Sequence, residues 1–108
     1  MEEYNNFVIY KIYQKDNPEI FYIGSTKNFS SRKSNHKKNC HNKVSKKYKY
    51  PLYQYIRALG GWDKFNIDIY ENYPCKSKGE GLQKEQEIID LLKPKLNSMN
   101  AKKINKIG

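Results

Sequence analysis

The sequence predicts a small α+β domain in which three helices flank a three-stranded, mainly antiparallel sheet, in the order β-β-α-α-β-α. Its length of 108 residues fits one domain. Three stretches show the period-two alternation of strands, and three others show the three-and-four spacing of helices. Because a short polar turn joins the first two strands, they are expected to form an antiparallel hairpin.

The two N-terminal strands are expected at residues 7–13 and 20–23. β-branched and aromatic side chains dominate both, and a turn rich in Asp, Asn and Pro joins them. Gly24 is expected to end the second strand. Tyr10 and Tyr22 then lie on neighbouring strands and can share a face of the sheet.

The first helix is expected from an N-cap at Asn28 to about residue 38. Arg32 and His36 are four residues apart in this helix, so they share one of its faces. Low apolar content predicts a loop over residues 39–49.

The second helix is expected from Pro51, which suits a first helical turn, to Gly60-Gly61. The third strand covers residues 65–70 and can pair with either strand of the hairpin. The third helix ends before Pro94. The residues expected on the buried faces of these elements are Leu52, Ile56, Leu59, Phe65, Ile67, Ile69, Leu82, Ile89 and Leu92.

Residues 1–97 are expected to form the domain and residues 98–108 a polar, basic tail. No apolar run approaches the roughly 18 residues of a membrane helix, and the acidic start is unlike a signal peptide. The expectation is a soluble, intracellular protein of the cytoplasm, nucleoid or nucleus, with no membrane partner. Two cysteines make no disulfide framework, so reduced thiols are expected.

The net charge of +10 is concentrated in one stretch. Residues 20–62 hold ten Lys or Arg residues and no Asp or Glu, whereas eleven basic and eleven acidic residues balance elsewhere. Such a stretch indicates a polyanion-binding surface, and the alternative is a merely solvated, Lys-rich face. The tyrosines in it that can stack on unpaired bases are Tyr48, Tyr50, Tyr53 and Tyr55. The residues expected to bind nucleic acid are Lys27, Lys33, Lys37, Lys38, the loop residue His41, Lys46, Lys47 and Lys49.

Glu85 falls between Leu82 and Ile89 on the apolar stripe of its helix. A carboxylate there costs several kcal/mol to desolvate unless a cation, metal or donor compensates it. The alternative is a residue at the edge of the stripe whose head reaches water. On the first helix, the guanidinium of Arg32 suits a phosphate and the imidazole of His36 can shuttle a proton near neutral pH, although such a pair can also mark a solvent-facing surface.

These residues lie in segments that resemble the signature of GIY-YIG nucleases. Val8-Ile9-Tyr10 and Tyr22-Ile23-Gly24 resemble the two tripeptides, and residues 25–36 resemble the helix that follows them. Residues 85–97 are similar to the glutamate helix and its closing Pro-x-x-Asn. Together the segments cover roughly residues 7–97. Val8 stands where the family name has Gly, and a strand position accepts Val at least as well.

The resemblance implies a metal-dependent endonuclease that hydrolyses DNA phosphodiester bonds. It assigns Glu85 as the sole protein ligand of one Mg2+ or Mn2+ ion. It also implies that Arg32 neutralises the negative charge that builds on the phosphate in the transition state. Tyr10 is expected to be the general base, with Tyr22 as its support or its substitute, and the sequence leaves the choice between the two open. The resemblance also implies that His36 binds phosphate or relays protons, and that Asn97 holds the site through hydrogen bonds.

With no DNA-binding module besides this domain in its 108 residues, the chain is expected to show weak sequence preference. Nicking, structure-selective cutting of branched or single-strand-containing DNA, and a monomer or weak DNA-dependent dimer all stay open. The main alternative is a non-catalytic, basic nucleic-acid-binding module on the same fold; a structural interaction protein explains the charged stretch poorly. A zinc site built from His36, Cys40, His41 and Cys75 has a spacing unlike common structural zinc sites.

Overall fold

The computed structural model of the protein describes residues 3–98. In order, its elements are β1 (Val8–Gln14), β2 (Phe21–Thr26), α1 (Phe29–His41), α2 (Pro51–Ala58), the 3-10 helix η1 (Trp62–Lys64), β3 (Phe65–Asn72), α3 (Lys78–Leu92) and the 3-10 helix η2 (Lys95–Ser98). The predicted α+β class and the order β-β-α-α-β-α are confirmed.

The sheet of the described residues is antiparallel, with the strand order β2-β1-β3. β3 pairs with β1, which settles the partner that the sequence left open. The pairing of β1 with β3 shifts in register between Ile9 and Tyr10, so the sheet is irregular beside Tyr10. β2 consequently lies at the edge of the sheet, where it has a strand neighbour on one side only.

β2 continues through Gly24 to Thr26, so the prediction that Gly24 ends the strand is wrong. Gly24 pairs with Tyr10 across the hairpin. A Cβ added at Gly24 would lie 2.5 Å from both Cζ and the hydroxyl oxygen of Tyr10. The glycine therefore makes room for the Tyr10 ring inside a regular strand rather than breaking that strand.

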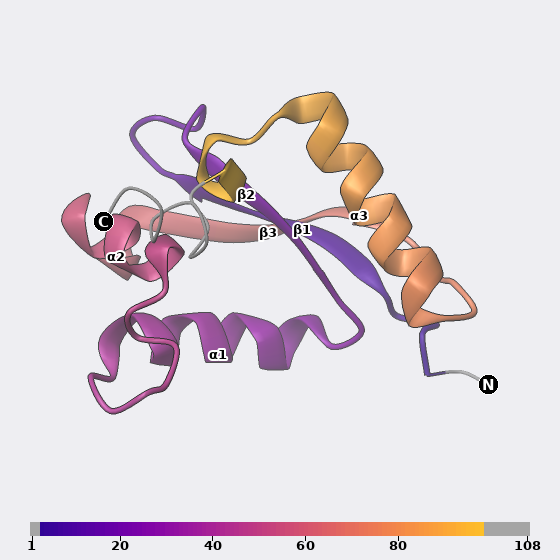
Figure 1. The fold of residues 1–108 in the computed structure, drawn as a ribbon, viewed down its shortest axis with the longest axis horizontal. Coiled ribbons are helices and arrows are strands. Elements are labelled where there is room, and N and C mark those ends of the chain that lie inside the picture. The colour runs from indigo at the N-terminus through magenta and orange to yellow at the C-terminus, as the bar shows by residue number, and fades with distance from the viewer. Residues whose placement is uncertain (1–2, 99–108) are drawn as a thin grey trace.

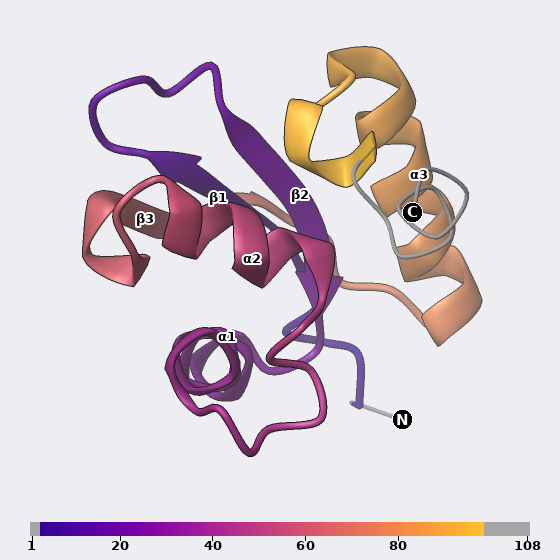
Figure 2. The same cartoon turned by 60° about the vertical axis from the view of Figure 1, so that its left-hand side comes forward.

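The sheet separates two apolar clusters. α1 and α2 lie on one side of the sheet and α3 lies on the other, as Figures 1 and 2 show. Since successive strand residues point to opposite faces, Tyr10 and Ile12 meet α1 and α2, whereas Ile9 contributes to the α3 side. The buried residues of the first cluster are Tyr10, Ile12, Cys40, Tyr53, Ile56, Trp62, Phe65, Ile67 and Leu96, and those of the second are Phe7, Ile9, Ile23 and Ile88.

α1 is longer than predicted, because it ends at His41 rather than near residue 38. The predicted N-cap is confirmed, since the side chain of Asn28 accepts a backbone N–H of the first turn. Cys40, four residues after His36, is fully buried, and Arg57 donates to its carbonyl at 2.9 Å. These contacts hold the last turn, so the placement of His41 in a loop is wrong.

The predicted buried faces of α2 and β3 are largely confirmed. Ile56 is fully buried, and Leu52 and Leu59 pack against the same cluster. Phe65 and Ile67 are buried as well. Ile69, however, is exposed beside the register shift within β3, so its predicted burial is wrong.

The predicted buried face of α3 is confirmed in part. Ile89 and Leu92 pack against the second cluster, as predicted. Leu82, however, is exposed, so its predicted burial is wrong, and Ile88 is the fully packed residue of this helix. Gly81 lies directly against the Phe7 ring, so the helix approaches the sheet closely at this point. Glu85, one turn after Gly81, is half-buried at the edge of the inward face.

The C-terminal segment returns to the sheet after α3. Lys93 ends the helix in the left-handed conformation, with φ of 50°, and Pro94 follows. η2 then places Leu96 in the first cluster. Ser98 ends η2, and the remaining residues of the predicted tail, 99–108, lie outside the described part. No helix within residues 3–98 has the length and apolar character needed to cross a membrane.

Candidate active site

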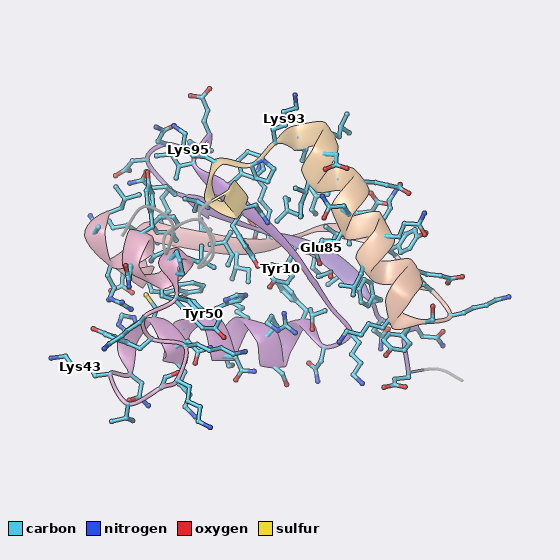
Figure 3. The ribbon with its side chains drawn as sticks, viewed as in Figure 1. Tyr10, Lys43, Tyr50, Glu85, Lys93 and Lys95 are labelled. Carbon is cyan, nitrogen blue, oxygen red and sulfur yellow. The ribbon has the colours of Figure 1, made fainter. Side chains whose placement is uncertain are left out.

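Two adjoining pockets open where the β1–β2 hairpin meets α1. The α3 pocket, about 470 Å³, lies between β2, the first turns of α1 and α3. The α2 pocket, about 860 Å³, lies between α1, the loop at residues 42–50, α2 and η2. Figure 3 shows Tyr10 and Glu85 between α1 and α3. The residues that line both pockets are Tyr10, Tyr22, Arg32 and Asn35.

Tyr10 and Tyr22 share one face of the hairpin, as predicted. Tyr22 lies opposite Ile12 and Tyr10 lies opposite Gly24, so the two tyrosines are diagonal neighbours across the strands. Their ring centroids are 6.5 Å apart. Both hydroxyl groups therefore belong to the surface that the two pockets share.

His36 is buried and bonded on both sides of its ring. Its Nε2 lies 2.7 Å from the Tyr10 hydroxyl, and its Nδ1 lies 2.8 Å from the Tyr53 hydroxyl. The Trp62 ring stacks on it, with 6.2 Å between centroids and 16° between planes. Burial, together with the charges of Arg32 and Lys47, lowers the pKa of His36 to about 4. The imidazole is consequently neutral at pH 7.

Arg32 lies at the junction of the two pockets, on the same face of α1 as His36. Its Nη1 donates to the Ser25 carbonyl at 3.3 Å and reaches the Tyr10 hydroxyl at 3.5 Å. The inward orientation of both side chains confirms the shared helix face and excludes a merely solvent-facing pair. The guanidinium of Arg32 thus contacts the Tyr10 hydroxyl and also lines both pockets.

Neither tyrosine of the site is acidic in the protein alone. Burial and the neighbouring Tyr22 raise the pKa of Tyr10 well above its usual value, and Arg32 only partly opposes this. Burial and the Glu85 carboxylate raise the pKa of Tyr22 to about 12. Both phenols therefore keep their protons at neutral pH unless further positive charge arrives.

Glu85 faces β2 from α3 and lines the α3 pocket. The Ser25 hydroxyl donates to one of its carboxylate oxygens. This donor set of a carboxylate and a hydroxyl consists of hard oxygens, which suit Mg2+ or Mn2+. Within residues 3–98 no three His, Cys, Asp or Glu side chains come together. A divalent ion held by this carboxylate would take most of its ligands from water, as Mg2+ commonly does.

Asn97 clamps the edge strand. Its Oδ1 accepts from the Ile23 backbone N–H at 2.7 Å, and its Nδ2 donates to the Ile23 carbonyl at 2.8 Å. These two bonds satisfy backbone groups that a further strand would otherwise take. The side chain thereby holds β2 between Tyr22 and Gly24, the two positions that contact or support Tyr10.

The residues predicted to bind nucleic acid are exposed, and they lie in different places. Lys46 and Lys47 line the α2 pocket, and Lys27 lines the α3 pocket, where it pairs with Glu3. The others are exposed on α1 or on the loop that follows it, namely Lys33, Lys37, Lys38, His41 and Lys49. Three of the eight therefore lie directly beside the site.

The four tyrosines expected to stack on bases differ in accessibility. Tyr53 is buried, so its predicted availability for stacking is wrong. Tyr55 packs against the first cluster, and the guanidinium carbon of Arg57 lies 3.7 Å from the centroid of the Tyr48 ring. Tyr50 is 49% exposed, lines the α2 pocket and stacks on Tyr53. Its side chain is the most exposed of the four.

The four residues considered for zinc do not converge. Cys40 is buried in the cluster under α1 and α2, whereas Cys75 packs against the cluster on the α3 side of the sheet. Both ring nitrogens of His36 are already bonded to tyrosines. The two cysteines are free thiols, and burial raises the pKa of Cys40.

Sequence reasoning missed three contributors to the site. Ser25 binds Glu85, Tyr53 binds His36, and Asn35 lines both pockets. The position of Ser25 directly after Tyr22-Ile23-Gly24 was a usable signal, because it lies next to the residue that supports Tyr10. Tyr53 carries no such signal, since a tyrosine in a basic stretch reads as a surface residue.

Comparison with protein families gives a match, whereas comparison with individual proteins does not. No curated protein and no solved structure matches the chain significantly. The model of the GIY-YIG catalytic domain matches residues 6–100, which is nearly the whole chain. The match includes both strands that carry the tyrosines, the helix with Arg32 and His36, and the helix with Glu85. The chain therefore belongs to the GIY-YIG catalytic domain family of nucleases.

Proposed function

We propose that the protein is a metal-dependent endonuclease that hydrolyses DNA phosphodiester bonds with low sequence specificity. One observation carries the proposal: Tyr10, Tyr22 and Arg32 line the same pocket as the Glu85 carboxylate. A module that only binds nucleic acid gains nothing from a carboxylate next to a phosphate, because the two charges repel. A phosphodiesterase uses such a carboxylate to hold a divalent cation.

In this proposal the scissile phosphate enters the α3 pocket beside Arg32. The guanidinium neutralises charge that builds on the phosphate oxygens as water attacks phosphorus. Glu85, held by the Ser25 hydroxyl, would bind the Mg2+ or Mn2+ ion. A divalent ion bound there polarises the phosphate, steadies the departing 3′-oxygen and adds positive charge that favours phenolate at Tyr10.

Tyr10 takes the proton of the attacking water in its phenolate form. Arg32 donates toward its oxygen and His36 lies within hydrogen-bond distance, so two groups of this chain can stabilise the anion. Tyr22 supports the Tyr10 ring from the neighbouring strand. Asn97 keeps that strand in place through both of its bonds to Ile23.

The deciding experiment incubates supercoiled plasmid with the protein and Mg2+ or Mn2+, and compares wild type with Glu85→Ala. Cleavage by the wild type and its loss in Glu85→Ala are expected. Glu87→Ala is the matched control, because Glu87 is exposed on the same helix and lines neither pocket of the site. Equal cleavage by all three proteins would refute the catalytic role. Plasmid binding without cleavage at every metal tried would favour the non-catalytic module.

The order in which nicked and linear plasmid appear shows how many protein chains act together on the DNA. Because one chain carries one such site, a monomer cuts one strand at a time, and open circles are expected before linear DNA. Linear DNA as the first product would instead indicate a DNA-dependent dimer.

A further inference from the structure

The α2 pocket differs in charge from the α3 pocket beside it. Glu85 lines the α3 pocket, whereas no Asp or Glu of residues 3–98 lines the α2 pocket. Arg32, Lys46 and Lys47 give the α2 pocket positive charge. Its volume of about 860 Å³ falls within the roughly 300–1,000 Å³ of pockets that enclose a small organic ligand. This pocket has no part in the reaction proposed for the α3 pocket, so its space can hold another part of the substrate.

A tyrosine ring of fixed position forms part of its wall. Tyr50 is the N-cap of α2, and its carbonyl accepts from the backbone N–H groups of Tyr53 and Gln54, each at 3.0 Å. Its ring stacks on the ring of Tyr53, with centroids 6.4 Å apart and 19° between planes. Tyr53 is itself buried, and its hydroxyl lies 2.8 Å from Nδ1 of His36. Tyr50 is thus supported from below and half exposed, so a second planar ring can stack on it.

The loop at residues 42–50, which carries this ring, is held by α2. The guanidinium of Arg57 donates to the carbonyl of Cys40 in the last turn of α1 at 2.9 Å, and to the carbonyl of Tyr48 in the loop at 2.7 Å. These bonds order the loop before any ligand arrives. Binding at the pocket therefore loses little conformational entropy.

The α2 pocket shares a wall with the pocket proposed to hold the scissile phosphate. The residues of this wall are Tyr10, Tyr22, Arg32 and Asn35. A base of a nucleotide next to the scissile phosphate therefore lies beside the α2 pocket, where Lys46 and Lys47 can neutralise a neighbouring phosphate. Asn35 is exposed, and its amide offers a donor and an acceptor to the edge of a base.

We propose that the α2 pocket binds one unpaired nucleobase, stacked on Tyr50, next to the scissile phosphate. A base in a duplex can enter only by leaving its stack and its partner, and this cost is smallest for a base that is already unpaired. The protein therefore selects DNA with an unpaired nucleotide and cuts beside it. Stacking is tolerant of base identity, so this selection adds no sequence preference. The place of the cut rests on the proposed function, whereas binding of the base does not.

Fluorescence anisotropy of the full chain in EDTA tests the pocket without cleavage. Three labelled DNAs of one sequence are compared: a perfect duplex, the duplex with one bulged nucleotide, and the bulged duplex whose extra nucleotide lacks its base. The bulged DNA with its base is expected to bind about tenfold more tightly than either of the others. Equal affinity for the bulged DNAs with and without the base would overturn the proposal, because the bend of the duplex alone would then explain binding.

Substitution of Tyr50 tests the stacking ring. Tyr50→Ala is expected to reduce the tenfold ratio between the two bulged DNAs to within about twofold, and Tyr50→Phe, which keeps the ring, is expected to retain it. Folding is expected to persist, since the side chain is half exposed. Tyr70→Ala is the matched control, because Tyr70 is exposed to a similar extent and lines neither pocket. A ratio that survives in Tyr50→Ala would contradict the role of this ring.

Cleavage of the same DNAs with Mg2+ or Mn2+ tests the place of the cut. Cutting is expected at a phosphate that adjoins the bulged nucleotide, with kcat/KM about tenfold higher than for the perfect duplex. Cuts unrelated to the position of the bulge would overturn the placement of the base beside the scissile phosphate. Absence of cleavage of every DNA would refute the proposed function instead, and the anisotropy would still decide whether the pocket binds the base.

Discussion

At the scale of single residues, His36 shows how burial decides the chemistry of a side chain. The sequence indicated an imidazole that titrates near neutral pH. In the fold the ring is 5% exposed, it lies between two tyrosines, and Arg32 and Lys47 add positive charge. Burial and the two positive charges disfavour the imidazolium, so the residue is a neutral hydrogen-bonding group rather than a cationic phosphate ligand at pH 7.

This burial predicts a pH dependence of folding. The unfolded chain binds a proton at His36 below about pH 6.5, whereas the folded protein does so only below a pKa of about 4. The stability that the neutral His36 contributes is therefore fully present above pH 6.5. As the pH falls from 6.5 to 4, this contribution lowers the free energy of unfolding by about 3 kcal/mol. The free energy of unfolding, measured by urea denaturation across this range, is expected to fall more steeply for wild type than for His36→Gln. The same pH dependence in wild type and His36→Gln would contradict a lowered pKa of His36 in the folded protein.

At the scale of elements, α3 shows how a glycine helps to position a carboxylate one helical turn away. Gly81 lies against the Phe7 ring, which brings the helix onto the sheet and places Glu85 beside Ser25 one turn later. Periodicity predicted the helix but assigned Leu82 to its buried face. The apolar residues of this helix are compatible with several rotations about the helix axis. The close contact between Gly81 and Phe7 goes with one of them.

Two glycines of α3 provide a matched test of this contact. An alanine gains about 0.5–1 kcal/mol over glycine in a helix, but overpacking costs typically about 1–3 kcal/mol. A Cβ at Gly79 would meet only the Ser77 hydroxyl at 3.8 Å, whereas one at Gly81 would overlap the Phe7 ring. Gly79→Ala is expected to raise Tm by a few degrees and Gly81→Ala to lower it, as calorimetry can measure. A rise in Tm for both variants would show that α3 does not pack tightly on Phe7.

The loop at residues 42–50 ends at Tyr50, whose side chain is exposed beside the α2 pocket. Tyr50→Ala is expected to weaken binding of a single-stranded oligonucleotide by about 1–3 kcal/mol, because the ring stacks on an unpaired base. Fluorescence anisotropy in EDTA measures binding without cleavage. Tyr50→Trp should restore affinity, and Tyr70→Ala is the control, since Tyr70 is 44% exposed and lines neither pocket. Equal affinities of wild type and Tyr50→Ala would exclude the stacking role.

At the scale of the whole molecule, positive charge lies both inside the site and around it. Arg32 lines both pockets, Lys27, Lys46 and Lys47 each line one, and further exposed lysines lie on α1 and the loop that follows it. Under the proposed function, such a surface would bind phosphates along a nucleic acid irrespective of base sequence.

A strong salt dependence of DNA binding follows from this arrangement. The logarithm of the association constant is expected to fall linearly with the logarithm of the salt concentration, with a slope of about −0.9 for each phosphate contacted. Replacing Lys46 and Lys47 together with Gln should make the slope shallower by about two. The same double change at Lys15 and Lys76, which line neither pocket, should leave it nearly unaltered. Affinity that barely responds to salt would contradict the phosphate-based surface.

Several features could be predicted from the sequence alone, namely the order of the elements, the N-cap of α1, the shared faces of Tyr10 with Tyr22 and of Arg32 with His36, and the family. These features depend on residues in nearby segments of the chain, so their spacing shows in the sequence. Three others emerge only from the fold: β3 pairs with β1, Gly24 stays within a strand and admits the Tyr10 ring, and Tyr53 is buried against His36. Each of these depends on which side chains from distant segments compete for the same space, and local periodicity does not contain that information.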